Sequence, residues 1–467
     1  MSAPPSIATL GQLKQSGYQP TSVRDEMRRN LIAALKAGRR LFAGIHGYDE
    51  TVIPQLENAI LAGHDVILLG ERGQAKTRLA RSLVQLLDEW MPIVAGSEIN
   101  DDPFRPVSAY ARRVVAEQGD ATPIEWVSRD RRFAEKLATP DTTIADLIGE
   151  VDPIKVAEGR YLSNEDVIAF GLIPRTNRGI FNLNELPDLA ERIQVGLLNI
   201  LEEEDVQIRG FQVRLPLDVM VVASANPEDY TNRGRIITPL KDRFGSQIRT
   251  HYPESIADEL TIVEQERTSF EVEGVSVEVP GFMQDIIAEI SRAARRSPDV
   301  SQRSGVSVRM TITNYEAMVA NAQRRALLLG EQKAVPRISD LEAIYPSTMG
   351  KVEFETFGEG RDDQVVDRII GEAVRAVFAR EVDPARLAPL LLAFENGLVV
   401  DVSDQAGAYT YIHQLSSVQG LGEIIESLGV GRDPASLASA IEFILEGLHR
   451  NRKLSKRTAG DGAHYSR

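Results

Sequence analysis

A short stretch of the sequence, Gly70–Thr77, combines the residue types that proteins use to hold a phosphate chain. Gly70 and Gly73 permit a tight backbone whose successive N–H groups point at one phosphate. Lys76 adds a positive charge, and Thr77 adds a hydroxyl that can bind Mg²⁺. We therefore predict that this loop binds ATP, with Mg²⁺ held at Thr77. The predicted binding residues are Gly70, Glu71, Arg72, Gly73, Gln74, Ala75, Lys76 and Thr77.

One position of the loop departs from the G-x-x-x-x-G-K-[ST] pattern of phosphate-binding loops. Ala75 stands where that pattern has its last glycine. A methyl group is tolerable there if the residue already has helical φ and ψ, because the loop has by then become the first turn of a helix. We therefore expect Ala75 to begin the helix that follows.

The elements on either side of the loop make the phosphate interpretation credible. Val66–Leu69 is a short, continuously apolar run, which is typical of a strand buried on both faces of a parallel sheet. After the loop, apolar residues recur at helical spacing from Leu79 to Leu87. The alternative is a chance glycine-rich turn, which would lack this strand, loop and helix order.

A second polar group follows another apolar strand, Gly179–Leu183, at Asn184 and Glu185. In nucleotide hydrolases such a pair holds the Mg²⁺ shell and polarises the attacking water. Asn184 keeps an acceptor oxygen for a metal-bound water but lacks a charge, so we expect weaker Mg²⁺ affinity and slow turnover. The alternative is a capped strand end with no chemistry. A third apolar strand, Val219–Ala225, ends at Asn226, whose amide can hydrogen-bond the attacking water or a phosphate.

The composition excludes several classes of protein. The chain has 467 residues, no cysteine and a net charge of −15. The absence of cysteine excludes disulfides and thiolate metal sites, and the acidic charge argues against tight binding to nucleic acid or to anionic membranes. No apolar run approaches the roughly 20 residues needed to span a bilayer, and the first residues lack the pattern of a secretion signal. We therefore expect a cytoplasmic protein without a membrane partner.

The pattern along the chain predicts five regions. Residues 1–44 form an N-terminal arm and helix. Residues 45–250 form an α/β ATP-binding core with three layers (αβα), in which helices cover both faces of a parallel sheet. Within the core, residues 90–139 are irregular, with one further sheet strand near Ile124–Val127. Residues 251–350 form a helical lid, residues 351–449 a further helical region, and residues 450–467 a basic, disordered tail.

Taken together, these motifs resemble the AAA+ ATPases, within the clade of magnesium-chelatase ATPase subunits and MoxR-like proteins. The resemblance covers about residues 45–310, and MoxR-like members often carry alanine before the lysine, as at Ala75. It implies that Asn184 and Glu185 are the Walker B pair and Asn226 is sensor 1. The stretch from Leu147 to Gly179 is similar to the insert of chelatase subunits, and Val206–Arg214 to the hairpin before sensor 1.

The resemblance also implies three residues that the local pattern alone would not single out. Arg243 corresponds to the arginine finger, Arg309 to sensor 2, and Tyr48 lies where many P-loop ATPases contact adenine. Arg243 follows the sensor strand beyond the rim of its own sheet, so we expect it to reach a neighbour's nucleotide. The alternatives are an ordinary ion pair for Arg243 and simple packing for Tyr48.

The function implied by this resemblance is an ATP-driven motor that remodels or assembles a protein partner. Members of the clade usually work as hexameric rings with a partner that carries a von Willebrand factor A domain. A nucleotide-gated scaffold with little hydrolysis stays open because of Asn184, and so does the ATPase subunit of a true metal chelatase. An activator of an alternative sigma factor is disfavoured, because the sequence lacks a Gly-Ala-Phe-Thr-Gly-Ala-like loop.

Overall fold

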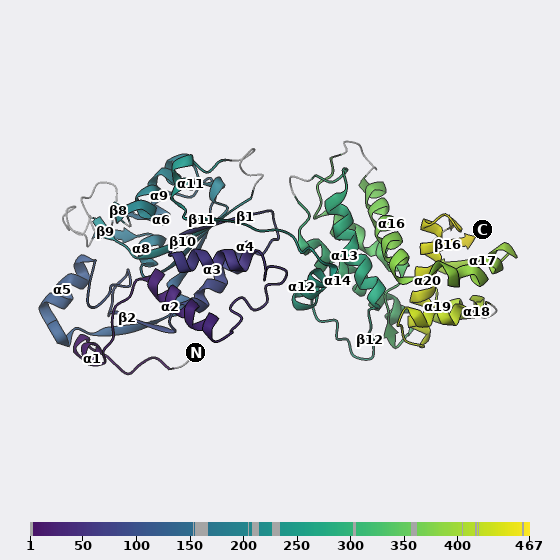
Figure 1. The fold of residues 1–467 in the computed structure, drawn as a ribbon, viewed down its shortest axis with the longest axis horizontal. Coiled ribbons are helices and arrows are strands. Elements are labelled where there is room, and N and C mark those ends of the chain that lie inside the picture. Colours follow the sequence, from purple (N-terminus) through teal and green to yellow (C-terminus); the bar gives the residue numbers. More distant parts are fainter. Residues whose placement is uncertain are drawn as a thin grey trace. The chain divides into compact units, whose positions relative to one another are not determined.

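The computed structural model describes most of the chain and divides it into two compact units. The described residues are 3–152, 154, 167–203, 205–207, 214–226, 234–301, 305–355, 362–403, 405–415, 418, 420–459 and 462–467. The first unit is Met1–His251 and the second is Tyr252–Arg467 (Figure 1). The boundary lies next to residue 250, where the sequence predicts the end of the ATP-binding core.

The first unit is built on a five-stranded parallel sheet. In spatial order, its strands are β11 (Ser246–Arg249), β1 (Val66–Leu69), β10 (Val219–Ala225), β7 (Gly179–Asn184) and β4 (Phe133–Leu137). All the residues of β7 and β10 are buried, as the apolar runs predict for strands covered on both faces.

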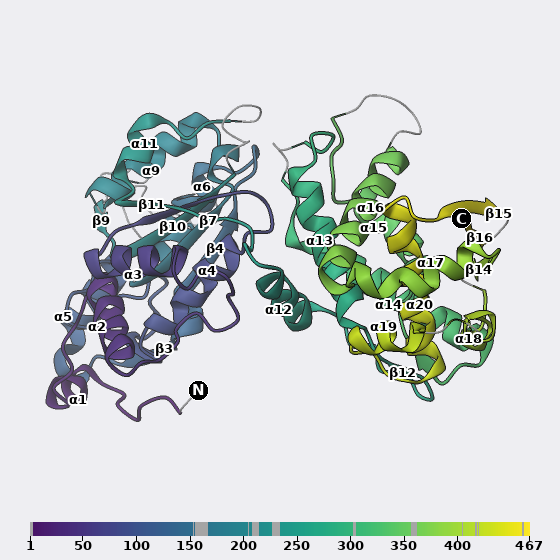
Figure 2. The ribbon, with the colours of Figure 1, turned by 45° about the vertical axis from the view of Figure 1, so that its right-hand side comes forward.

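Helices cover both faces of this sheet (Figure 2). Alternate residues of β1 point to opposite faces, so Val66 and Leu68 join one hydrophobic core and Ile67 joins another. The first core is completed by α2 (Val23–Lys36), α3 (Val52–Ala62) and α4 (Lys76–Ser82) with η1 (Leu83–Leu86), and the second by α6 (Ile144–Leu147), α8 (Leu172–Arg175), α9 (Glu191–Glu203) and α11 (Thr238–Arg243). The predicted αβα fold with a parallel sheet is therefore confirmed.

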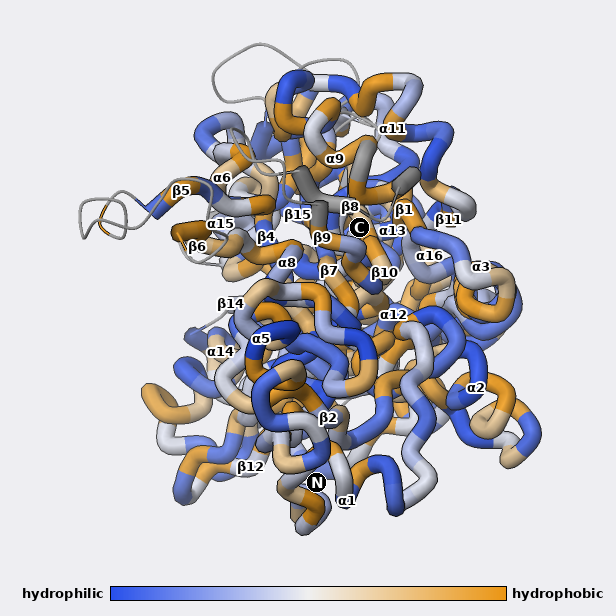
Figure 3. The backbone as a smooth tube through the Cα atoms, turned by 90° about the vertical axis from the view of Figure 1, so that its left-hand side faces the viewer, coloured by the Kyte–Doolittle hydropathy of each residue, from blue (hydrophilic) through white to orange (hydrophobic). Residues whose placement is uncertain are grey.

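Helix α2 shows how the sequence pattern produces the outer layers. Hydrophilic and hydrophobic residues alternate along it (Figure 3), and Val23, Met27 and Leu31 form its buried face. Ser22 caps the helix by accepting a hydrogen bond from the Asp25 N–H, as expected of a serine that precedes a helix. The apolar stripe thereby lies against the sheet.

The region between residues 90 and 139 differs from the prediction. A strand does form at β3 (Ile124–Ser128), but it pairs antiparallel with β2 (Trp90–Val94) in a separate two-stranded ribbon. The edge strand of the central sheet is β4 instead. The ribbon also orders the N-terminal arm, since the Ala8 carbonyl accepts from the Ile124 N–H, and the N–H of Leu10, the first residue of α1 (Leu10–Gln15), donates to the Thr122 carbonyl.

The remaining elements of the first unit are short. Part of the insert between Leu147 and Gly179 forms an antiparallel pair, and the predicted hairpin near Val206–Arg214 pairs antiparallel as well. Residues 153, 155–166 and 208–213 lie outside the described residues. The elements are α5 (Ala109–Gln118), η2 (Gly119–Ala121), η3 (Arg129–Arg132), β5 (Gly149–Val151), β6 (Ile168–Phe170), η5 (Leu186–Asp188), β8 (Asp205–Gln207) and β9 (Arg214–Pro216).

The second unit is mainly helical, and its main hydrophobic core includes residues from Val263 to Tyr465. The predicted lid (251–350) and the predicted C-terminal region (351–449) both contribute to this core. Phe282 of α13 stacks on Phe443 of α20, with ring centroids 4.5 Å apart. The two predicted regions therefore form one packed body.

The helices and small strands of this unit have the following bounds. They are α12 (Ile256–Glu266), β12 (Ser276–Val277), α13 (Gly281–Arg296), α14 (Val308–Leu329), β13 (Lys333–Ala334), η6 (Ile338–Ile344), α15 (Tyr345–Met349), α16 (Asp362–Glu381), η7 (Pro384–Leu387), α17 (Ala388–Glu395), α18 (Ala408–Leu415), α19 (Leu421–Ser427) and α20 (Pro434–Arg450). In the part of the chain that the structure describes, no helix has the length and hydrophobicity needed to cross a membrane.

The predicted disordered tail is instead a strand pair. Strand β16 (Gly462–Ser466) pairs antiparallel with both β15 (Ser455–Ala459) and β14 (Val400–Ser403). Tyr465 is 2% exposed, and its hydroxyl donates to the buried Glu446 carboxylate of α20. The composition of the tail is basic, but its buried Leu454 and Tyr465 anchor it to the core. The prediction of disorder took account of the charge and not of these two residues.

Candidate nucleotide-binding site

The phosphate loop lies between β1 and α4 and requires its first glycine. A Cβ atom on Gly70 would lie 1.9 Å from Thr250 Oγ1 and 2.2 Å from Gln74 Oε1, which is far inside contact distance. Gly73 has a φ of +76°, in the left-handed region that favours glycine. Both glycines are therefore needed for the tight path of the loop.

Ala75 does not have the right-handed helical conformation that the sequence analysis expected. Its φ is 55° and its ψ is 17°, so it is left-handed, and α4 begins only at Lys76. Such a conformation costs a residue with a Cβ about 1–2 kcal/mol. Its carbonyl still accepts the first helical bond, from the Leu79 N–H at 2.9 Å. The loop thus holds a strained residue beside the predicted phosphate site.

The side chain of Gln74 is part of the loop's support. It is 6% exposed, and its Oε1 accepts from the Glu71 N–H at 3.0 Å and from Thr250 Oγ1 at 2.7 Å. Thr250 directly follows β11, so this bond fixes the loop to the edge of the sheet. Of the predicted ATP contacts, Gln74 can therefore offer only its backbone.

Tyr48 lies below the same loop. It is 4% exposed, and its hydroxyl lies 2.9 Å from the Gln74 carbonyl and 2.7 Å from the His251 carbonyl. Its ring packs edge-on against His251, with centroids 4.9 Å apart. Burial raises the pKa of Tyr48 to about 12, against the opposing effect of its hydrogen bonds. The adenine contact stays a prediction, and the packing alternative describes these contacts.

Lys76 connects the loop to the strand beside it. The residue is 7% exposed, and its ammonium donates to the carbonyls of Gly70 and Glu71 and to Asn226 Oδ1 at 2.7 Å. These acceptors keep the charge at the mouth of the loop. A phosphate oxygen would replace neutral acceptors with a charged one, which roughly doubles the strength of each hydrogen bond.

The three predicted polar groups at the strand ends meet at one edge of the sheet. Asn226 Nδ2 donates to Glu185 Oε2 at 2.9 Å, and Thr77 Oγ1 lies 3.5 Å from Asn184 Oδ1. They come together because β1, β10 and β7 are adjacent and parallel, so their carboxyl ends share one edge. Glu185 has a φ of 54°, a second strained residue at this edge.

Glu135 is a residue of this edge that the sequence analysis missed. It lies on β4, and its Oε1 accepts from Asn184 Nδ2 at 2.7 Å. Arg81 of α4 forms an ion pair with it, with Nε 2.7 Å from Oε2. The signal was weak because the strand Phe133–Leu137 mixes apolar and charged residues and lacks the continuous apolar run of the central strands.

The two remaining predicted residues lie away from this cluster in sequence. Arg243 is the last residue of α11; its NH1 donates to the Pro239 carbonyl at 3.2 Å and its side chain is 29% exposed. Arg309 is exposed in the first turn of α14, in the second unit, where its N–H donates to Ser307 Oγ. Their roles as arginine finger and sensor 2 stay predictions.

The donor set of the edge fits a magnesium nucleotide. Mg²⁺ prefers hard oxygen ligands, and the hydroxyl of Thr77 with the amide oxygen of Asn184 supplies them beside a lysine and a carboxylate. Among the described residues, Asn182 Oδ1 is a buried side-chain oxygen without a hydrogen-bond partner, two residues before Asn184 on β7. Such an atom at a polar edge calls for a water or an ion.

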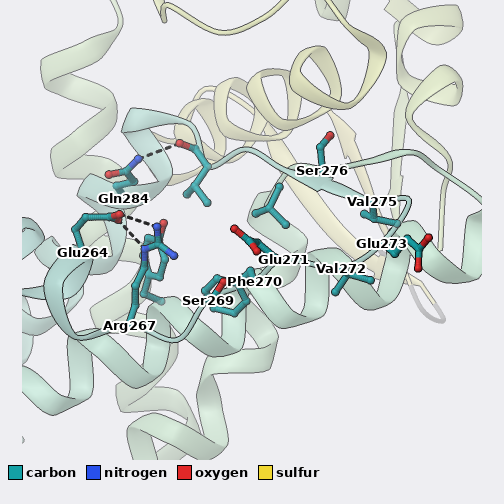
Figure 4. A pocket seen from close by; sticks show the side chains of 13 residues that line it. Glu264, Arg267, Ser269, Phe270, Glu271, Val272, Glu273, Val275, Ser276 and Gln284 are labelled. Carbon is teal, nitrogen blue, oxygen red and sulfur yellow. Dashed lines mark hydrogen bonds and ion pairs between the residues drawn. The ribbon is translucent and has the colours of Figure 1, made fainter.

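A cavity of about 710 Å³ in the second unit offers a contrasting lining (Figure 4). Its charged residues are Glu264, Glu271, Glu273 and Arg267, and Arg267 is paired with Glu264 at 2.6 Å. An acidic lining repels phosphate. The polar edge of the first unit is therefore the better nucleotide site.

The chain is similar in sequence to a known domain family and to several known proteins. A family model described as AAA domain (dynein-related subfamily) matches residues 124–244. Magnesium-chelatase subunit ChlI of Nostoc sp. is 31% identical over 238 residues, which cover 49% of this chain and 59% of that protein. The chloroplastic subunit ChlI of Nicotiana tabacum is 27% identical over 341 residues, covering 69% of this chain and 75% of that protein. The chain thus spans less than two thirds of the Nostoc relative.

Solved structures resemble the chain only loosely. A model of the complex between subunits BchI and BchD of magnesium chelatase has 18% identity and a TM-score of 0.37, covering 70% of this chain and 98% of that one. Hsp104 in a closed state has 11% identity and a TM-score of 0.40, covering 70% and 53%. In its parallel sheet, its phosphate loop and its sequence relatives, this chain is similar to the AAA+ ATPases of the magnesium-chelatase-like clade.

Proposed function

We propose that the protein binds ATP with Mg²⁺ at the edge formed by Lys76, Asn226 and Glu185, and hydrolyses it to remodel or assemble a protein partner. The observation that carries this proposal is the hydrogen-bonded chain from the loop carbonyls through Lys76 and Asn226 to Glu185. It joins a cation, a neutral amide and a carboxylate within one polar edge. These are the groups that phosphoryl transfer to water requires.

Each residue has a role that follows from its chemistry. The loop and Lys76 would hold the phosphates, and Thr77 and Asn184 would hold Mg²⁺, which would neutralise phosphate charge. Glu185 accepts the proton of the attacking water, and Asn226 orients Glu185 through its 2.9 Å bond. Arg309 closes the nucleotide of its own chain, and Arg243 stabilises the charge on a neighbour's nucleotide.

The role of Arg243 implies an assembly of several copies. If each chain supplies its finger to the next, every site is complete only between subunits, and a closed ring gives each site one finger. A hexamer of MoxR type, with a partner that carries a von Willebrand factor A domain, is the form we propose. The names of the relatives also admit the ATPase subunit of a metal chelatase.

The test of the proposed site is calorimetric titration of ATP in the presence of Mg²⁺. Lys76→Ala should weaken binding about 10- to 100-fold, because the lost bonds to a charged acceptor contribute about 1.5–3 kcal/mol. The control is Lys36→Ala, at the exposed end of α2, which should bind as the parent does. Unchanged affinity in Lys76→Ala would exclude this site.

A second function, a nucleotide-gated scaffold, is favoured by one observation: a neutral amide occupies position 184. Such a protein would bind ATP as above but hydrolyse it barely. The two functions separate in a phosphate-release assay on the parent and on Glu185→Gln. A motor loses most of its turnover in the variant, whereas a scaffold shows the same negligible rate in both.

A further inference from the structure

The side-chain amide of Asn184 is held in one orientation by its neighbours. Its Oδ1 accepts from Ser224 Oγ at 3.2 Å and from Asn182 Nδ2 at 3.3 Å, and Thr77 Oγ1 lies at 3.5 Å. Its Nδ2 donates to Glu135 Oε1 at 2.7 Å. Every neighbour of the oxygen is a donor and the neighbour of the nitrogen is an acceptor. The environment therefore suits an amide and would not suit a carboxylate.

The register of the sheet explains why Glu135 is the neighbour. Strand β4 pairs in parallel with β7, and Glu135 lies opposite Asn182. Residues two apart on a strand share a face, so Glu135, Asn182 and Asn184 all lie on the same face of the sheet. The carboxylate of Glu135 thus brings a full negative charge within one hydrogen bond of position 184.

We propose that Glu135 supplies the negative charge that Asn184 lacks, so that the two residues together replace the single carboxylate that would otherwise lie beside Mg²⁺. Asn184 offers the oxygen beside Thr77, and Glu135 offers the negative charge and fixes the amide. Glu135 is thus a positioning residue for the metal. This inference rests on the proposed nucleotide site, and it replaces the expectation that Asn184 by itself makes metal binding weak.

The competing explanation is that Glu135 serves only its ion pair with Arg81. The Arg81 side chain is 64% exposed and that of Glu135 is 23% exposed. Exposed pairs contribute little to stability, because solvent screens their charges. Under this explanation, removing either partner breaks the same pair and has the same effect. Under the proposal, the two removals have opposite effects on the metal.

The experiment measures Mg²⁺ binding without turnover. ADP is titrated into the full-length protein in a calorimeter at a series of Mg²⁺ concentrations, and the result is the Mg²⁺ concentration that gives half of the maximal effect on ADP binding. The proteins are the parent, Glu135→Gln, Asn184→Asp, the double variant and Arg81→Gln. Glu135→Gln should raise that concentration about tenfold, because a nearby charge acts strongly on a divalent ion. Arg81→Gln should lower it, since Glu135 is then no longer shared with a cation.

The substitution at position 184, alone and combined with Glu135→Gln, gives the more discriminating comparison. Asn184→Asp alone places two carboxylates at hydrogen-bond distance, where they repel each other, so it should not strengthen Mg²⁺ binding. Adding Glu135→Gln restores one amide and one carboxylate at hydrogen-bond distance, now with the amide at position 135 and the carboxylate at position 184. The double variant should therefore bind Mg²⁺ within about threefold of the parent.

Several results would overturn the inference. They are an unchanged Mg²⁺ requirement in Glu135→Gln, the same change in Glu135→Gln and Arg81→Gln, or tighter Mg²⁺ binding in Asn184→Asp alone. In each case Mg²⁺-dependent ADP binding by the parent would leave the proposed site standing. A parent protein that binds no nucleotide would overturn the proposed function, and the role of Glu135 with it.

Discussion

One cluster of polar groups from each unit shows that this protein buries polar side chains for two different purposes. In the first unit, Lys76, Asn226, Glu185 and Asn184 lie together where parallel strands end, in bonds that a ligand can replace. In the second unit, buried charges satisfy one another inside a helical core. Buried polarity is therefore not by itself the mark of a site. The mark is its position at the carboxyl edge of a sheet, beside a glycine loop.

Asp340 shows the structural use of a buried charge. It is 0% exposed and accepts from Arg325 NH1 at 2.5 Å, from the Arg337 N–H at 2.7 Å and from Asn321 Nδ2 at 2.8 Å. It thereby connects α14 with the start of η6. Glu442 of α20 is similar: burial raises its pKa, and the Ser339 N–H and the Tyr411 hydroxyl donate to it.

The largest expected effect that tests this contrast is at Arg243, where we expect a loss of turnover without a loss of stability. We expect Arg243→Ala to lower turnover roughly 10³-fold, as loss of an arginine finger does, and to leave the stability of the first unit unchanged. Neither Arg243→Ala nor Lys76→Ala protein should hydrolyse ATP alone, and mixing the two should restore part of the activity. The measurement is steady-state phosphate release, with ring formation checked by sedimentation.

The matched control for this prediction is Arg235→Ala. Arg235 is an exposed arginine that forms a 3.6 Å ion pair with Glu191, and its loss should change turnover little. No recovery on mixing, in rings that do assemble, would mean that Arg243 does not act on a neighbour. Arg243 would then have only a structural role in the first unit.

The opposite effect is expected at Asp340 in the second unit. Asp340→Ala leaves Arg325 buried and unpaired, which should lower the free energy of unfolding of this unit by about 3–5 kcal/mol. Affinity for ADP should stay that of the parent. Both tryptophans, Trp90 and Trp126, lie in the first unit, so their fluorescence follows that unit, whereas circular dichroism also follows the helices of the second.

A surface carboxylate gives the control for Asp340. Asp367 pairs with Arg450 at 3.0 Å but is 55% exposed, so Asp367→Ala should cost less than about 1 kcal/mol. If Asp340→Ala shifted the fluorescence transition as strongly as the dichroism transition, the two units would not be separate in stability. The comparison between them would then fail.

The third prediction concerns acid and gives the smallest effect. Burial alone would raise the pKa of Glu446, but Lys456, Tyr465 and Arg450 outweigh it and lower the pKa to about 2 from 4.5. A carboxyl with a lowered pKa in the folded state stabilises the protein above its unfolded pKa. The second unit should therefore lose about 3 kcal/mol as the pH falls from about 4.5 to about 2.

This acid sensitivity is measured by denaturant unfolding across that pH range, with Glu446→Gln as the reference. The variant cannot gain a proton at this position, so the difference between parent and variant should shrink as the pH falls. Parallel curves for the two proteins would show that Glu446 is not the titrating group. The first unit, followed by tryptophan fluorescence, should behave alike in both proteins.

The sequence predicted the parts of the site that follow continuous apolar strands. Asn184, Glu185 and Asn226 each end a strand that is buried on both faces, and such strands are recognisable by composition alone. The αβα fold followed from the same runs. Glu135 was not predicted because its strand, β4, is the outermost strand of the sheet. One side of such a strand needs no apolar cover, so its sequence mixes apolar and charged residues.

The other differences also have physical causes. The left-handed conformation of Ala75 is imposed by the closed loop around it, including the bonds of Gln74 to Glu71 and Thr250, and no local preference of alanine predicts it. The tail became a strand pair because β16 also pairs with β14, which lies much earlier in the chain, and because Tyr465 donates to the buried Glu446. Arg243 stays a prediction, because the site it is expected to complete belongs to another copy.

The hydroxyl of Tyr48 has a single proton to donate but faces two carbonyl oxygens, those of Gln74 and His251. Gln74 belongs to the phosphate loop, and His251 is the last residue of the first unit. The two carbonyls therefore compete for one proton, and whatever fixes one of them shifts the balance at the other. A ligand that moved the Gln74 carbonyl would therefore also alter the hydrogen bond between Tyr48 and the His251 carbonyl, where the chain leaves the first unit.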